Sequence, residues 1–438
     1  MDYPENLIVT WGKETVGFLH QKPKQGSFTF QYDDNWLDNN FPPISFSLPL
    51  RNEPYNWEDC INFFQNLIPE GDSLNNIATY KRLSTNNIYD FLRRYGKECA
   101  GALIIHDSNE EIDYTNHTYI DVTDQILDAI SNPKKKDINL LVLTNARLSL
   151  AGAQNKLPVL FKKDKFYIPA KDSIAATTHI IKPASTRFKK LHINETFCMK
   201  LAEELGLPVA KSDILTIDKV DIYITERYDR KIMYDGTIQK LHQEDFCQAL
   251  GYPNSRKYES SGGPGIKQCL DFIINNDISD QTTAKLNFSK LLIFNFIIGN
   301  CDAHAKNISI LYDFDDKNII NHSLAPFYDL VSTKIYKNLS RELAMFIGKT
   351  KEHGLLSKES INILIEDLQF EKKDFGEMAF SFIQNIQNSV RKIMKIYSSH
   401  DEICKFQKVL YRIINTNCKL FLNPLHKLLH SPKNRPRP

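Results

Sequence analysis

The chain has 438 residues, a formal net charge of +2, 42% hydrophobic residues and 25% charged residues. This is the balance of an ordinary globular protein, and the length predicts two or three domains. The near-neutral charge argues neither for nor against a nucleic-acid partner. No apolar run reaches the roughly 20 residues of a membrane-spanning helix, and the first residues lack the features of a signal peptide. We therefore expect a cytoplasmic protein without a membrane partner, whose eight scattered cysteines stay reduced.

The N-terminal part combines strand and helix patterns. Period-two alternation predicts a small antiparallel sheet within residues 7–50. The expected strands are residues 7–11, 16–19, 27–32 and 44–48. Residues 57–98 show helical spacing, and residues 84–87 can cap a helix that carries Phe91 and Leu92. A strand is expected again at 100–105, followed by a soft domain boundary near 110–140.

From Leu148 the pattern becomes that of strands around a loop, with one helix expected at 194–205. The expected strands are residues 157–161, 165–168, 178–182, 214–217 and 222–226. After about residue 240 the chain reads as mostly helical, with long amphipathic stripes. We predict an α+β fold with an N-terminal β/α subdomain and a bilobal kinase-like part. The predicted divisions are 1–135 for the subdomain, 136–240 for the small lobe and 241–438 for a mainly helical lobe.

The stretch richest in reactive side chains lies at 298–307, between two apolar runs. Asp302 and Asn307 have the Asp-x-x-x-x-Asn spacing of the catalytic loop in protein-kinase-type enzymes. Such an Asp orients the attacking hydroxyl, and the Asn binds Mg²⁺, with Asp329 as a second ligand downstream. A zinc site that includes His304 is an alternative, but no second His lies at a metal-binding spacing. Oxygen ligands suit magnesium better.

Two upstream residues could contact ATP. Lys182 ends an apolar strand and could place its ammonium against the phosphates, and Glu195 in the next helix could hold that ammonium. Each has an ordinary alternative. Lys182 could be an edge-strand lysine that reaches water, and Glu195 a charge that suits a helix N-terminus.

A loop of small residues precedes this lysine. In the 149–156 segment, small side chains would let backbone N–H groups approach phosphate oxygens, although a plain tight turn fits as well. The candidate ATP contacts there are Ala151, Gly152, Ala153, Gln154 and Lys156.

A charged segment at 226–230 ends a strand where the two lobes of a kinase would join. There the backbone around Glu226 and Tyr228 could read an adenine edge, and Asp229 could reach a ribose. A charged turn is the alternative. The order of loop, lysine, glutamate, hinge, Asp-to-Asn pair and final aspartate indicates an ATP-using, kinase-like site.

These same stretches resemble the HipA toxin kinases of bacterial type II toxin–antitoxin modules. The resembling stretches are residues 150–156, 179–182, 194–195, 226–230, 243–245, 257–259, 262–265, 302–307 and 326–329, with 67–71 and 96–102 upstream. The likeness therefore spans nearly the whole chain. Tyr228 departs from the family's hinge and should stack much as a Phe would.

The resemblance implies a two-domain serine/threonine kinase that uses ATP and Mg²⁺. Asp302, His304 and Lys182 would be the catalytic residues, and His304 would also contact ATP. Asn307 and Asp329 would bind the metal. Gln154 would lie over the phosphates. Ser149 matches the family's autophosphorylation site, where about two added negative charges beside an anion-binding loop would eject that loop and silence the enzyme.

The resemblance also implies partners. Family members arrest growth by phosphorylating aminoacyl-tRNA synthetases or related translation factors. A helix-turn-helix antitoxin of the HipB type neutralises them, and the complex binds operator DNA. This chain shows no helix-turn-helix pattern, so DNA contact would come mainly through the antitoxin.

Two rival functions remain from other classes. A small-molecule kinase of the aminoglycoside type shares the Asp-to-Asn spacing, but the loop with Ser149 and the N-terminal sheet disfavour it. A catalytically silent corepressor that works only with its antitoxin is disfavoured by four intact site residues, Asp302, Asn307, Asp329 and Lys182.

The C-terminus is basic and has no acidic residue after Glu402. The basic residues there are Lys405, Lys408, Arg412, Lys419, Lys427, Lys433, Arg435 and Arg437. They form either a solvated helix face with a tail or a surface for a phosphate backbone or an acidic partner.

Overall fold

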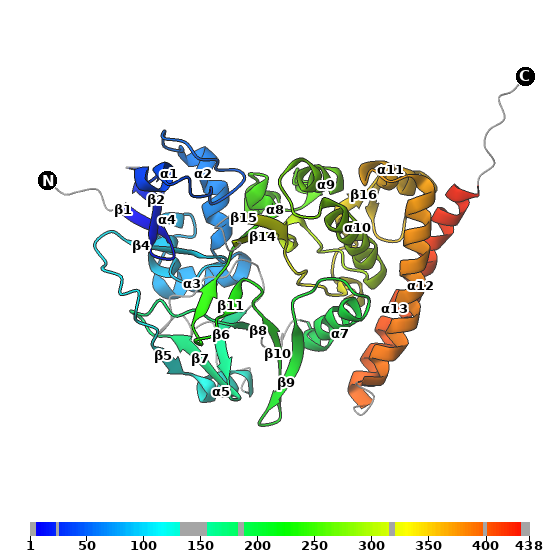
Figure 1. The fold of residues 1–438 in the computed structure, drawn as a ribbon. Coiled ribbons are helices and arrows are strands. Elements are labelled where there is room, and N and C mark those ends of the chain that lie inside the picture. Colours follow the sequence, from blue (N-terminus) through cyan, green and yellow to red (C-terminus); the bar gives the residue numbers. More distant parts are fainter. Residues whose placement is uncertain are drawn as a thin grey trace, which may run out of the picture. The chain divides into compact units, whose positions relative to one another are not determined.

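The computed structural model describes residues 6–22, 26–131, 156–182, 188–314, 320–396 and 401–430. The chain forms two compact units that interleave along the sequence (Figure 1). The first unit comprises Met1–His192, Ala210–Ser255 and Ser309–Ala325, and the second comprises Ile193–Val209, Arg256–Ile308 and Pro326–Pro438. These units cut across the three consecutive segments expected from the sequence.

The first unit begins with a four-stranded antiparallel sheet of order β3-β2-β1-β4. Its strands are β1 (Asn6–Trp11), β2 (Glu14–Gln21), β3 (Phe28–Tyr32) and β4 (Leu103–Asp107). The helices beside it are α1 (Asp34–Asp38), α2 (Trp57–Phe64), η1 (Gln65–Leu67), α3 (Gly71–Lys81) and α4 (Ile88–Tyr95). The sheet and helices share a core rich in aromatic residues, including Phe28, Phe30 and Phe64. The predicted strands at 7–32 and the capped helix at 88–95 are confirmed.

The strand expected at 44–48 is wrong. Leu48 N–H donates to Ser45 O at 3.0 Å, which makes a turn there. Tyr32 takes up two further backbone groups, because its hydroxyl accepts from Ile44 N at 3.1 Å and donates to Leu48 O at 2.6 Å. Alternation was misleading here, because side chains satisfy backbone groups that a neighbouring strand would otherwise pair.

A six-stranded antiparallel sheet of order β5-β7-β6-β8-β10-β9 follows in the same unit. Its strands are β5 (Tyr119–Asp121), β6 (Leu157–Lys162), β7 (Lys165–Pro169), β8 (His179–Lys182), β9 (Ser212–Ile217) and β10 (Val220–Glu226). Helix α5 (Thr123–Ser131) packs on it, and Ile126, Phe166 and Ile181 lie in their shared core. All five strands predicted between 157 and 226 are confirmed.

Smaller elements complete the first unit. They are the hairpin β11 (Arg230–Ile232) and β12 (Ile238–Lys240), the sheet of β13 (His242–Asp245), β14 (Ser309–Phe314) and β15 (Ile320–Leu324), and the short helix α8 (Phe246–Ala249). The turn η2 (Asn254–Arg256) spans the boundary between the units.

The second unit is mainly helical. Its helices are α7 (Leu191–Glu204, from Ile193 on), α9 (Ile266–Asn275), α10 (Gln281–Ile298), α11 (Lys358–Asp367), α12 (Lys372–Ile396) and α13 (Asp401–Leu429). Short turns η3 (Glu259–Ser261), η4 (Ala305–Asn307) and η5 (Thr333–Ile335) and a hairpin of β16 (Glu342–Ile347) and β17 (Thr350–Glu352) connect them.

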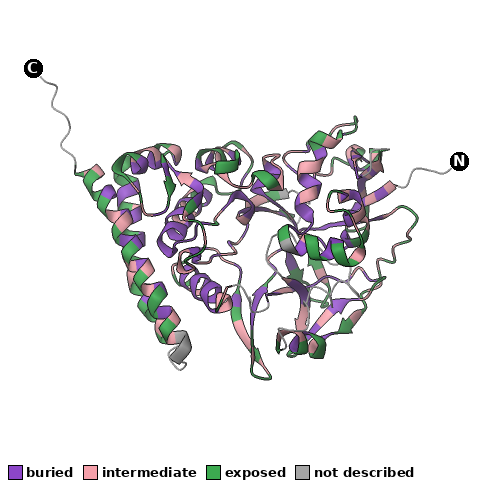
Figure 2. Cartoon of the chain, turned by 180° about the vertical axis from the view of Figure 1, so that it is seen from behind, coloured by how far each residue is buried: buried purple, intermediate pink, exposed green. Residues whose placement is uncertain are grey.

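The long C-terminal helices confirm the predicted amphipathic stripes. Ile383, Ile386 and Val390 of α12 are fully buried, and Figure 2 shows buried and exposed residues alternating along these helices. The basic residues of α13 that the structure describes all lie on its exposed face: Lys405, Lys408, Arg412, Lys419 and Lys427. Over the described residues, no helix combines the length and apolar character needed to cross a bilayer. All eight cysteines are free thiols.

Candidate functional site

The loop that carries Asp302 begins at a sharp helix stop. Helix α10 is buried from Leu291 to Ile298 and ends at Gly299, whose φ of 74° is a left-handed conformation. A side chain there would be strained, and its Cβ would lie 2.8 Å from Cβ of Lys334. The glycine therefore lets an apolar helix turn abruptly into a polar loop.

Neighbouring segments fix this loop on both sides. Cys301 N–H donates to Thr333 Oγ1 at 2.8 Å, and Lys334 N–H donates to Gly299 O at 2.9 Å. On the other side, Ala344 N–H of β16 donates to Cys301 O at 3.1 Å. The loop is thus held by backbone contacts while the Asp302 side chain remains exposed.

Asn307 closes the loop back onto Asp302. Its Nδ2 donates to the backbone oxygen of Asp302 at 3.0 Å, and Asp302 N–H donates to Asn300 Oδ1 at 3.1 Å. Because the amide nitrogen is used inside the loop, the amide oxygen Oδ1 is the atom that Asn307 can offer to a cation.

Asp329 follows in the same unit, with a left-handed backbone at φ of 55°. Such a conformation is uncommon for a residue other than glycine, and it clusters at functional sites. The preceding residue, Tyr328, donates its hydroxyl to Lys306 O at 2.8 Å, which ties this segment to the Asn307 turn. The amide oxygen of Asn307 and the carboxylate of Asp329 are the oxygen donors that Mg²⁺ prefers.

Few protein ligands are offered for a metal. Within the described ranges, no group of three or more His, Cys, Asp or Glu side chains could hold an ion. Magnesium in phosphotransferases is commonly bound by one or two side chains together with substrate phosphates. The donor set of Asn307 and Asp329 fits that pattern.

The Asp329 segment is braced by residues around helix α7. Asn194 makes a paired contact with Ser332, in which Asn194 Nδ2 donates to Ser332 O and Ser332 N–H donates to Asn194 Oδ1, each at 3.0 Å. Phe327 N–H donates to Pro208 O at 2.8 Å. Glu195, which follows Asn194 on α7, is buried with 2% of its surface exposed.

His304 lies within the loop and is buried, with 6% of its surface exposed. Its ring meets the ring of Tyr258 edge to face, with 5.2 Å between centroids. The hydroxyl of Tyr258 donates to Asp302 Oδ1 at 2.6 Å. Sequence reasoning had placed Tyr258 in a matching stretch without a role. The adjacent cluster of glycines was the one local signal that this segment is tightly shaped.

Lys182 belongs to the first unit, as the last residue of β8 opposite Tyr223 of β10. Only 8% of its surface is exposed, and its Nζ lies 5.4 Å from the centroid of the Tyr223 ring. Lys182 is therefore too buried to be an edge-strand lysine whose ammonium reaches water.

From Glu226, the last residue of β10, to Asp229, the side chains alternate between outward and inward positions. The backbone of this segment extends the sheet, because Glu226 N–H donates to Lys211 O at 2.8 Å and Arg227 N–H to Thr178 O at 2.9 Å. Glu226 is exposed and Tyr228 is half-buried, whereas Arg227 and Asp229 point inward and are buried. Tyr228 donates its hydroxyl to Gln243 Oε1.

The ribose contact expected of Asp229 needs correction. Its Oδ1 accepts from Arg227 Nε at 3.0 Å, and its Oδ2 accepts from Arg227 Nη2 and from Gly101 N–H, each at 2.8 Å. Burial would raise the pKa of Asp229, but Arg227 and Arg230 outweigh burial and hold the pKa below its usual value. Both oxygens are engaged inside the first unit, so this carboxylate is structural.

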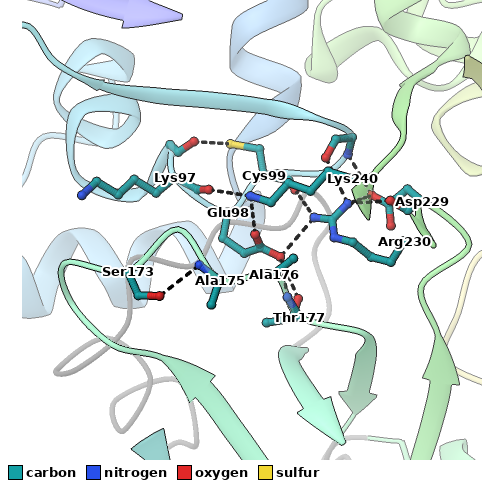
Figure 3. Close-up of polar contacts among 12 residues, drawn as sticks. Lys97, Glu98, Cys99, Ser173, Ala175, Ala176, Thr177, Asp229, Arg230 and Lys240 are labelled. Atoms are coloured by element: carbon teal, nitrogen blue, oxygen red, sulfur yellow. Dashed lines mark hydrogen bonds and ion pairs between the residues drawn. The ribbon is translucent and has the colours of Figure 1, made fainter. Parts of the chain in front are cut away.

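Asp229 belongs to a buried ion network (Figure 3) whose other carboxylate is Glu98. Glu98 Oε1 accepts from Arg227 Nη1 at 2.9 Å and from Arg230 Nη2 at 3.0 Å. Its Oε2 lies 2.7 Å from Lys240 Nζ. Burial alone would raise the pKa of Glu98, but these three cations hold it well below its usual range. Sequence reasoning missed this pairing, because no spacing links residue 98 to residue 227.

The remaining predicted residues are placed as follows. Lys156 is half-buried just before β6. Ser149, Ala151, Gly152, Ala153 and Gln154 lie outside the described residues.

An exposed aspartate on a braced loop with an asparagine five residues on has the pattern of a kinase-type catalytic loop, and the first unit separately contains a buried strand lysine. Comparison with known proteins agrees. A family model described as the HipA-like C-terminal domain matches residues 148–398, and one described as the HipA N-terminal domain matches residues 7–106.

Individual relatives point the same way. The chain is 38% identical over 352 residues to the protein Y4mE of Sinorhizobium fredii, covering 78% of this chain and 81% of that one. It is 28% identical over 349 residues to the serine/threonine-protein kinase toxin HipA of Shewanella oneidensis, covering 77% of each. The chain belongs to the HipA family, and its enzyme class is that of a serine/threonine-protein kinase.

A solved structure supports the fold. The fold matches that of a chain in the solved Shewanella oneidensis complex of HipA, HipB and operator DNA, with a TM-score of 0.83 and 22% identity over 98% of this chain and 100% of that chain. The mixed helix and sheet architecture predicted from the sequence is therefore confirmed.

Proposed function

We propose that this protein is the kinase toxin of a type II toxin–antitoxin module, which uses ATP and Mg²⁺ to phosphorylate a translation factor such as an aminoacyl-tRNA synthetase. The observation that carries this proposal is the exposed Asp302 on a braced loop, with Asn307 turned back on it at 3.0 Å. An aspartate so placed suits the task of orienting a protein hydroxyl for attack on a phosphoryl group.

The proposal gives each residue a role. Asp302 orients the substrate hydroxyl and takes its proton, while Asn307 and Asp329 bind Mg²⁺, which neutralises phosphate charge when bound. The ammonium of Lys182 contacts the phosphates. The remaining proposed ATP contacts are Lys156, Glu195, Glu226, Tyr228 and His304.

Regulation is proposed to act through Ser149. Autophosphorylation there would place about two negative charges beside a loop that binds phosphate through Ala151, Gly152, Ala153 and Gln154. The loop would then lose its affinity for ATP, and the kinase would be silenced.

The proposed partners are a helix-turn-helix antitoxin of the HipB type and, through it, operator DNA. Support comes from the structural match, which is to a solved complex of the Shewanella oneidensis HipA, HipB and operator DNA.

Intact mass spectrometry tests the kinase activity and the modified residue together. The wild type incubated with ATP and Mg²⁺ should gain one phosphate, and Asp302→Ala should gain none. Ser149→Ala should lose the autophosphorylation while still phosphorylating its protein substrate. A wild type that gains no phosphate would contradict the proposal.

The cellular role needs a separate experiment. Induced wild type should arrest growth and Asp302→Ala should not, and quantitative phosphoproteomics after induction should show the phosphorylated translation factor. Arrest by both variants would indicate toxicity without catalysis.

A further inference from the structure

The loop from Arg256 to Gly265 brings one hydroxyl to Asp302. Tyr258 donates to Asp302 Oδ1 at 2.6 Å, a short distance of the kind found for an O–H donor and a carboxylate. The same ring packs edge to face on His304. One side chain therefore contacts two residues of the proposed catalytic loop, and both contacts lie within the second unit.

Backbone geometry fixes the position of Tyr258. Gly263 N–H donates to Tyr258 O at 2.9 Å, which closes a turn. A Cβ on Gly263 would lie 2.0 Å from the backbone oxygen of Arg256, so only glycine fits there. Gly262, at φ of 80°, supplies the left-handed conformation that the turn needs.

Glu259 anchors the loop from the other side. Its Oε2 accepts from Phe346 N–H of β16 at 2.6 Å. A Cβ on Gly265 would come within 3.0 Å of the Glu259 carboxylate, so that glycine leaves room for it at the start of α9. Burial raises the pKa of Glu259. The loop is tied to the hairpin that also contacts Cys301, so Tyr258 and Asp302 share one support.

We propose that Tyr258 is a positioning residue for phosphoryl transfer, holding Oδ1 of Asp302 so that Oδ2 receives the substrate hydroxyl. This inference rests on the proposed function. In that step the substrate oxygen bonds to the γ-phosphorus, the bond from that phosphorus to the bridging oxygen breaks, ADP leaves with the electron pair, and the hydroxyl proton passes to Asp302. A carboxylate free to rotate would present Oδ2 in many orientations, and misplacement costs rate steeply.

In the opposite role, here called a plug, the Tyr258 hydroxyl would block the site by occupying the position of the substrate hydroxyl. A plug would slow the enzyme, so its removal would raise the rate. The braced loop favours the positioning role. A blocking tyrosine would have to move away in every catalytic cycle, but Tyr258 is held by the contact of its backbone with Gly263 and by the contact of Glu259 with Phe346.

Tyr258→Phe tests the proposal, because it removes one oxygen and keeps the ring on His304. The rate of phosphate gain at saturating ATP should fall about ten- to a hundred-fold, the effect of losing a hydrogen bond to a charged group. The ATP concentration at half-maximal rate and the affinity for a fluorescent ATP analogue should stay unchanged. Damage to folding would instead shift those two quantities or the melting temperature.

Tyr234→Phe is the matched control, since it removes the same atom from a fully exposed tyrosine in the first unit and should leave the rate unchanged. Tyr258→Ala should slow the reaction further, because the packing on His304 is lost as well. An active wild type with an equal or higher rate for Tyr258→Phe would overturn the inference alone. A wild type that transfers no phosphate would overturn the proposed function and the inference together.

Discussion

At the scale of single residues, Glu244 is a carboxyl group buried among donors. It accepts from Ser45 Oγ at 2.5 Å, from Phe46 N–H at 3.0 Å and from the hydroxyl of Tyr312. Burial raises the pKa of Glu244 to about 7, although these hydrogen bonds lower it in part. Glu244 thus holds the 44–48 segment in its turn and can change charge near neutral pH.

This pKa predicts a pH-dependent stability. Because the folded state binds the proton more tightly than the unfolded state, the contribution of Glu244 is fully present below its ordinary pKa of about 4.5 and is lost as the pH rises through about 7. The loss should be on the order of 3 kcal/mol. Urea unfolding at pH 5 and pH 8 should show it in the wild type, and Glu244→Gln should be less sensitive to pH. Equal pH sensitivity of the two proteins would contradict the assignment.

Glu98 predicts a larger effect of a single substitution. Glu98→Gln removes the charge that faces Arg227, Arg230 and Lys240, and breaking a buried ion pair costs about 3–5 kcal/mol. The urea midpoint should fall accordingly. Glu203→Gln, which breaks a half-exposed pair with Lys200, should cost less than about 1 kcal/mol. Similar losses in the two variants would argue against a role for the network.

Residue chemistry was only partly readable from the sequence. The proposed pair of Asp302 and Asn307 could be predicted because its spacing is local. The engagement of Asp229 with Gly101 could not be found, because it joins residues far apart in the chain whose proximity only the fold decides. The same holds for Tyr258, which approaches Asp302 through a turn shaped by glycines.

At the scale of elements, periodicity predicted regular strands and helices well and failed where side chains replaced backbone partners. The six-stranded sheet and the C-terminal helices follow their sequence patterns. Residues 44–48 alternate like a strand, yet Tyr32 and Glu244 capture their polar groups. These hydrogen bonds come from residues outside the 44–48 segment, so the alternation within that segment cannot predict them.

The 256–265 loop gives a prediction at this scale. Gly263→Ala would place a Cβ 2.0 Å from the backbone oxygen of Arg256, so the turn must open and Tyr258 must move. Phosphate transfer should fall at least as far as in Tyr258→Phe. Ser260→Ala, at an exposed position in the same loop, should leave the rate unchanged. Wild-type activity of Gly263→Ala would show that the loop geometry does not matter.

At the scale of the whole molecule, the family domains and the compact units differ. The N-terminal family domain spans residues 7–106, yet it shares the first unit with the six-stranded sheet. The reason is chemical, because Glu98 accepts hydrogen bonds from Arg227 and Arg230, and Gly101 N–H donates to the carboxylate of Asp229. Composition suggested a boundary near 110–140 but carried no signal of this contact.

That contact predicts how fragments behave. Residues 1–107 and 108–438 produced together as separate chains should associate, since each leaves buried charges unpaired without the other. Co-purification through a tag on one fragment measures this. Glu98→Ala in the shorter fragment should abolish recovery, whereas Glu53→Ala, at an exposed position, should not.

The buried network also constrains how such proteins recombine. A gene exchange with a junction near residue 107 would inherit Glu98 from one parent and Arg227, Arg230 and Lys240 from the other. A hybrid protein would fold stably only if both parents carry charges that pair in this network. The segments before and after the junction should therefore be inherited together, although the junction itself lies in a surface segment.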